Sequence, residues 1–96
     1  MAMYVMLSTL TEAGRRVVQQ QPERIIEVNR EVEAMGAHVV EQWATLGPYD
    51  FVNIVEAPDN ETVMRVSTAL AARGTVQFLT MPAIPVRGFI SGLKGG

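Results

Sequence analysis

The sequence Thr45-Leu46-Gly47-Pro48-Tyr49-Asp50 lies between two apolar runs that have the length and composition of β-strands. Gly47 can adopt a positive φ at no steric cost, and Pro48 fixes its own φ at about −65° and has no N–H to donate. Asp50 can accept hydrogen bonds from nearby backbone N–H groups. These residues favour a tight reversal, so the flanking runs 37–45 and 51–57 are predicted to pair as an antiparallel hairpin.

Strand and helix signals alternate before this hairpin. Residues 3–10 are rich in β-branched, aromatic and Met side chains and are too few for a helix, which predicts a strand. A helix is predicted over about residues 22–35, because apolar side chains recur there on one helical face before a glycine. Residues 11–21 are predicted to form only a loose helical turn, since Gly14 and a run of glutamines interrupt any apolar stripe.

After the hairpin the same alternation continues. Asp59 is predicted to be the N-cap of a second helix that ends at Gly74, and residues 75–83 are predicted to form a fourth strand. The order β-α-β-β-α-β is that of the ferredoxin-like fold, in the α+β class. Right-handed crossovers then place both helices on one face of a four-stranded antiparallel sheet.

The other face of this sheet has no cover within the chain. An uncovered apolar face is too large a patch for a stable monomer, so we expect a homodimer or a higher homo-oligomer that forms through the sheet. The residues expected on this face are Tyr4, Met6, Val40, Phe51 or Val55.

Composition limits the classes of partner. The chain has 96 residues, which predicts a single domain over residues 1–96, and its apolar fraction of 48% against 19% charged residues leaves apolar surface for a partner. A net charge of −2 lacks the basic excess that drives phosphate binding, which argues against nucleic acid. Because there is no cysteine, disulfides, thiolate nucleophiles and the commonest structural zinc sites are excluded.

The two ends of the chain carry apolar segments of different kinds. Residues 1–7 are apolar, but no basic region precedes them and polar residues follow directly, so we expect neither a signal peptide nor a membrane span. A cytoplasmic location without membrane contact is therefore expected. Residues 86–96 form a C-terminal tail, in which Phe89, Ile90 and Leu93 have helical spacing and predict a short docking turn.

Two segments, WATLGPYD (residues 43–50) and IVEAPD (residues 54–59), resemble the GYD-domain family of small bacterial and archaeal proteins. The resemblance extends from the first predicted strand to Ala83. The signature Gly, Tyr and Asp correspond to Gly47, Tyr49 and Asp50, with Pro48 between the first two. The resemblance implies a ferredoxin-like domain that dimerises through its sheets, as dimeric α/β barrel proteins do, and it implies no reaction.

Four residues are candidates for catalysis. Tyr49 and Asp50 can line the mouth of a site, although turn chemistry alone explains Asp50. Glu56 lies in an apolar strand, where it is either a general base or a solvated acid at the strand end. His38 is the only histidine, and an imidazole suits either proton transfer or a surface position. If paired hairpin residues have numbers that sum to about 95, His38 and Glu56 lie on opposite faces, and only a change of register by one residue would bring them together.

The candidate ligand-binding residues are Tyr4, Trp43 and Asn53. Trp43 can stack on a flat ligand or pack in a core or an interface, and Arg24 can contribute to an anion site near a helix N-terminus. No cofactor or metal site is expected, because one histidine and scattered carboxylates have no recognised ligand spacing.

Two hypotheses about function follow from the sequence. In the first, the protein is a cytoplasmic homo-oligomer that binds or acts on a small apolar or aromatic molecule between sheet and helices. In the second, it is a non-enzymatic assembly or regulatory module that works through protein–protein contacts.

Overall fold

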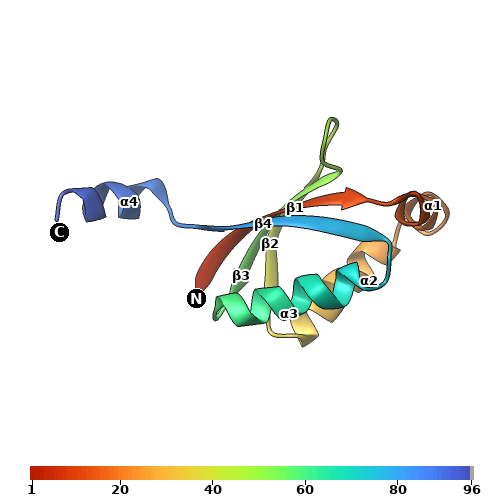
Figure 1. Ribbon diagram of the computed structural model, residues 1–96, viewed down its shortest axis with the longest axis horizontal. Helices are drawn as coiled ribbons and strands as arrows, with labels where there is room; N and C mark the ends of the chain where they lie inside the picture. Colours follow the sequence, from red (N-terminus) through yellow and green to blue (C-terminus); the bar gives the residue numbers. More distant parts are fainter. Residues whose placement is uncertain (96) are drawn as a thin grey trace.

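The computed structural model describes residues 1–95, which form one antiparallel sheet with helices packed on one of its faces (Figure 1). The strand order is β2-β3-β1-β4. The elements are β1 (Ala2–Leu10), α1 (Glu12–Gln20), α2 (Arg24–Ala34), β2 (His38–Ala44), β3 (Phe51–Ala57), α3 (Asn60–Ala71), β4 (Val76–Ala83) and α4 (Val86–Leu93). This is the ferredoxin-like α+β arrangement, and the predicted fold class is confirmed.

The turn between β2 and β3 forms at the predicted residues. Gly47 has a φ of +108°, and Thr45 N donates to the Asp50 carbonyl oxygen at 2.8 Å. The Asp50 side chain also reaches the neighbouring strand, where its Oδ2 accepts from Leu10 N at 2.7 Å. In addition, Asp50 N donates to the Ser8 carbonyl oxygen at 2.8 Å. The hairpin is therefore tied to β1 at the turn as well as along the ladder.

A β-bulge changes the register of the hairpin away from the turn. Near the turn the pairing is as predicted, with Trp43 opposite Val52. The bulge leaves Val40 without a partner in β3, and beyond it His38 lies opposite Glu56. The prediction that His38 and Glu56 lie on opposite faces was wrong, because the additional residue of the bulge shifts the pairing by one.

The helices cover the face of the sheet that carries the buried residues of β1 and β3. The core consists of buried side chains from these strands, from α2 and α3, and from the connection between α2 and β2: Tyr4, Met6, Val32, Ala37, Val55, Ala57, Val63, Val66 and Leu70. The expectation that Tyr4, Met6 and Val55 lie on the open face was therefore wrong. Phe51 shares their face, since it pairs with the buried Ser8, whereas Val40 is exposed. Because β1 is apolar on both faces, its alternation cannot indicate which face the helices cover.

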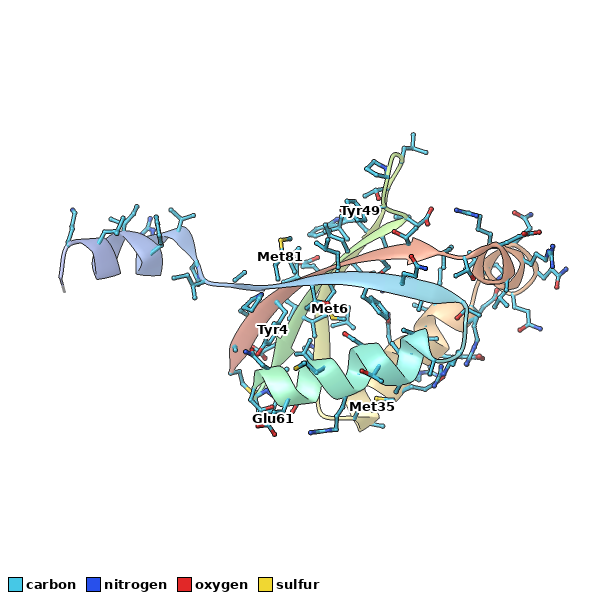
Figure 2. All side chains as sticks on the ribbon, in the orientation of Figure 1. Tyr4, Met6, Met35, Tyr49, Glu61 and Met81 are labelled. Atoms are coloured by element: carbon cyan, nitrogen blue, oxygen red, sulfur yellow. The ribbon has the colours of Figure 1, made fainter. Side chains whose placement is uncertain are left out.

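The open sheet face carries the alternate residues of the same strands. Leu7 lies between Val52 and Leu79, and the next row across the sheet places Val5 between Ile54 and Met81. We define the open sheet face as Val5, Leu7, Trp43, Val52, Ile54, Leu79 and Met81. Figure 2 shows Met81 on the opposite side of the sheet from Met6 and Tyr4. None of α1, α2 and α3 covers this side of the sheet (Figure 1).

Residues 12–20 form a complete helix, α1, where only a loose turn was predicted. Thr11 caps this helix, since its Oγ1 accepts from Gly14 N at 3.1 Å and its N donates to the Thr75 carbonyl oxygen at 3.0 Å. Gly14 is buried against Thr75, and a Cβ at position 14 would lie 1.9 Å from the Thr75 carbonyl oxygen. The glycine that weakens the helix signal in the sequence is thus what lets α1 approach the start of β4.

We expect Gly14→Ala to destabilise the protein by about 1–3 kcal/mol, because the added methyl group collides with backbone rather than with a movable side chain. Gly88→Ala is the matched control, since a Cβ there meets no atom within 4 Å and alanine favours the helix. Urea unfolding at one fixed protein concentration measures both variants. Equal stability of Gly14→Ala and the wild type would contradict this close contact.

Candidate functional site

A cavity of about 350 Å³ lies between the sheet and the helices, on the face that also holds the core. Residues from α1, α2, α3 and all four strands contribute to its lining. Most of these side chains are apolar, among them Val17, Ile25, Val28, Val32, Phe51 and Phe78. The volume lies within the range of about 300–1,000 Å³ that is usual for small-molecule sites.

One wall of the cavity carries a chain of polar side chains that crosses four elements. Gln42 Nε2 donates to Asn53 Oδ1 at 2.8 Å and to Asn29 Oδ1 at 3.2 Å. Asn29 Nδ2 donates back to Gln42 Oε1 at 2.8 Å. Asn53 Nδ2 donates to Ser8 Oγ at 2.7 Å and to the Met6 carbonyl oxygen at 2.8 Å. We call Asn29, Gln42, Asn53 and Ser8 the amide chain; its mutual hydrogen bonds let polar groups lie under the helices at little cost.

Two arginines stand where the cavity meets solvent. Arg24 and Arg73 line the cavity, and their side chains are 36% and 35% exposed. Both pair with Glu31: Arg24 Nη1 lies 3.0 Å from Oε1, and Arg73 Nη2 donates to Oε2. The hydrogen bond from Arg73, together with the charges of both arginines, lowers the pKa of Glu31 below its ordinary value of 4.5, although burial acts in the opposite direction. We call Arg24 and Arg73 the arginine pair.

The structure places the three predicted ligand-binding residues in different locations. Asn53 is 7% exposed and lines the cavity. Tyr4 is 2% exposed and donates its hydroxyl to Asn60 Oδ1 at 2.6 Å, beside a separate hollow between β1, β4 and α3. Trp43 is 52% exposed on the open sheet face. A single pocket built from these three residues does not form.

The four catalytic candidates also lie apart from the cavity lining. Glu56 and His38 lie opposite each other on the outer side of the hairpin, and His38 Nδ1 is 3.3 Å from Glu33 Oε1. The Asp50 carboxylate is held by Leu10 N, and the Tyr49 carbonyl oxygen accepts from Thr45 Oγ1 at 2.7 Å. Asp50 thus has the structural role in the turn that the sequence offered as an alternative.

Sequence reasoning missed most of the polar residues of the cavity, although two of them carry a signal. Asn29 lies four residues after Ile25 and three before Val32, so it is a polar residue inside the apolar stripe of α2. Gln42 is opposite Asn53 under the predicted register. Ser8 and Arg73 carry no such signal. Arg24, predicted as a possible contributor to an anion site, does line the cavity.

Comparison with known proteins identifies the family. A family model described as the GYD domain matches residues 4–92. The chain belongs to the GYD-domain family. A Thermus thermophilus protein named "Glutamine synthetase and cystathionine beta-lyase binding protein" is 52% identical to this GYD chain over 95 residues, which cover 98% of this chain and 100% of the relative.

Solved structures agree with the GYD fold. The crystal structure of the Thermus thermophilus protein TTHA0845 is 22% identical, with a TM-score of 0.56 over 88% of this chain and 95% of its own. A second solved structure has the same identity and a TM-score of 0.58. At this identity the likeness shows the fold alone. Within residues 1–95 no helix is both long and apolar enough to cross a membrane, and no three His, Asp or Glu side chains are grouped as metal ligands.

We expect the stability contributed by the charged form of Glu31 to be present above about pH 4.5 and to disappear as the pH falls through its lowered folded-state pKa. Glu31→Gln lacks this contribution. The difference in unfolding free energy between wild type and variant should therefore shrink between about pH 6 and about pH 3. Urea unfolding across this range measures it, and the other carboxyl groups cancel because both proteins contain them. A difference that stays constant with pH would contradict the ion pairing of Glu31 with the arginine pair.

Proposed function

We propose that this GYD protein is a non-enzymatic assembly module, which self-associates through the open sheet face and binds partner proteins through α4. The observation that carries the proposal is the amount of apolar surface left on one side of so small a body. Leu79 and Met81 are 46% and 43% exposed in the middle of β4, and Trp43 is 52% exposed on β2, on the same face. A patch of this kind on a monomer is typical of an interaction surface.

A second copy of the chain is the occupant that fits the open sheet face. The face lies on strands and is apolar along its two central rows on β1, β3 and β4, while the β2 side carries Glu41 opposite Ile54 and one border carries Glu56 and His38. Two such faces can pack against each other about a two-fold axis, so that each copy buries the same residues of the other. This supports the sheet-mediated dimer expected from the sequence, and the proposal retains the cytoplasmic location expected there.

Helix α4 supports the second part of the proposal. It follows β4 through Ile84 and Pro85 and projects away from the body (Figure 1). Its exposed apolar stripe consists of Val86, Phe89, Ile90 and Leu93. An isolated helix of eight residues that contains Gly88 and Gly92 is marginal in water, so a surface that covers the stripe is what would stabilise it.

The occupant proposed for this stripe is a groove on another protein, in which an amphipathic helix lays its apolar face. The relative that is 52% identical is named for binding glutamine synthetase and cystathionine beta-lyase. We therefore propose enzymes of these two kinds as the first partners to test. Self-association through the open sheet face would determine the oligomer, and α4 would contact the partner enzyme.

We expect Leu79→Glu to produce monomers or insoluble protein, because it introduces an unpaired charge into an apolar contact. Ile26→Glu is the matched control, since Ile26 is similarly exposed, at 54%, but lies on α2. Sedimentation velocity distinguishes the variants. A wild type that stays monomeric at tens of micromolar, or a soluble dimer of Leu79→Glu, would refute self-association through this face.

We expect Phe89→Glu to keep the dimer but to weaken partner binding at least about tenfold, because the charge enters the apolar stripe of α4. Ser91→Glu, on the same helix but outside the stripe, should bind as the wild type does. Calorimetric titration with glutamine synthetase and cystathionine beta-lyase from the same organism provides the measurement. If the wild type binds neither enzyme, or if Phe89→Glu binds both unchanged, α4 is not the contact.

A further inference from the structure

We propose that the interior cavity binds a small amphipathic carboxylate, a molecule with one aliphatic or aromatic body and a single carboxylate at one end. This site is separate from the open sheet face and from α4, and it goes beyond the assembly function. It develops the hypothesis of a small apolar ligand between sheet and helices into a defined ligand class. Three features of the cavity carry the inference: its size, the state of its polar wall and the charge at its edge.

The size of the cavity calls for an apolar body larger than benzene. A cavity of about 150 Å³ with apolar walls stays dry and accommodates benzene. The present cavity, at about 350 Å³, is more than twice as large and is lined mainly by aliphatic side chains and two phenyl rings. Such walls gain free energy only from contact with an apolar occupant, because water inside would lack hydrogen-bond partners over most of the surface.

The polar wall restricts the ligand to one polar end. The Nε2 group of Gln42 and the Nδ2 group of Asn53 each already donate two hydrogen bonds, within the amide chain or to backbone. A second charged or strongly polar group placed against this wall would break hydrogen bonds that have no replacement. The part of the ligand that lies over the sheet is therefore apolar.

The charge at the edge selects a negative end. The charged side chains that line the cavity are Arg24 and Arg73, whereas Glu31 pairs with both from outside the lining. The contacts of the arginine pair within residues 1–95 use Nη1 of Arg24 and Nη2 of Arg73, so the other N–H groups of both guanidiniums remain for a ligand. A guanidinium holds a carboxylate with two parallel hydrogen bonds.

The nearby glutamates limit the charge of the ligand to one. Arg24 Nη1 is 3.3 Å from Glu27 Oε1, in addition to its contact with Glu31. Two arginines beside two carboxylates have no large positive excess, so a doubly charged phosphate would meet repulsion that a single carboxylate largely avoids. An ammonium group in the cavity would instead face the two guanidiniums, which line it, whereas both glutamates lie outside the lining. The arrangement thus favours a monocarboxylate over a cationic or a doubly anionic molecule.

The test uses octanoate as the probe, with octanol and octylamine as ligands that share its chain but differ in the polar end. Isothermal titration calorimetry on the full chain measures affinity, and amide NMR shifts report where each molecule binds. We expect octanoate to bind more tightly than octanol, octylamine not to bind, and the shifts to map to α1, α2 and the cavity side of β3. Failure of octanoate to bind, or tighter binding of octanol or octylamine, would overturn the proposal.

Two variants separate the polar end from the body of the ligand. Arg73→Gln should weaken octanoate binding about tenfold and leave octanol binding unchanged, which also shows that the cavity is intact. Arg30→Gln, an exposed arginine on α2 outside the lining, is the matched control and should bind both as the wild type does. Val28→Phe should fill the cavity and abolish binding of both molecules. Unchanged octanoate binding by Arg73→Gln or by Val28→Phe would overturn the assignment.

Discussion

The carboxylate of Asp50 joins the hairpin turn to the end of β1, and much of the structure depends on this link. Its Oδ2 accepts from Leu10 N, and the backbone N–H of the same residue donates to the Ser8 carbonyl oxygen. Together these bonds fix the register of β3 against β1. A slip of one residue would exchange the two faces of the strand, so the link decides which side chains the helices cover.

That register divides the covered face into two regions. At the end of β1 that carries Tyr4, buried side chains of β1, β3 and α3 pack together beside the second hollow between β1, β4 and α3. At the other end, Ser8 and Asn53 are joined through Gln42 to Asn29 of α2, and the cavity lies in front of them. Hydrogen bonds between the side-chain amides of Asn29 and Gln42 hold α2 to the sheet beside the cavity, where apolar side chains would otherwise fill the cavity. The two ends of the covered face therefore differ in chemistry, with apolar packing at one end and a hydrogen-bonded polar wall at the other.

The sequence was sufficient for the four strands and for α2 and α3, because each of these elements carries its own local signal. The turn at Gly47, the N-cap at Asp59 and the alternation of strands with helices gave the order of elements, and the resemblance to GYD domains agreed with it. The face of β1 that the helices cover was not predictable, because the side chains of this strand are apolar on both faces and do not indicate which face is buried. Helix α1 was missed because its stability comes from the contact of Gly14 with Thr75, which is distant in sequence.

The candidate site was less accessible to sequence reasoning than the fold. Asn53 was identified, but the other members of the amide chain, Gln42, Asn29 and Ser8, come from three other elements, and only the assembled fold brings them together. The prediction placed His38 and Glu56 on opposite faces because it extended the register found near the turn past the bulge, where the pairing changes by one residue. That bulge, at Val40, has a consequence for how the molecule can aggregate. It interrupts the regular hydrogen-bonding pattern of β2, and Pro82 leaves the opposite edge strand, β4, with one N–H fewer, so both edges of the sheet are poorer templates for the addition of further chains into fibrils.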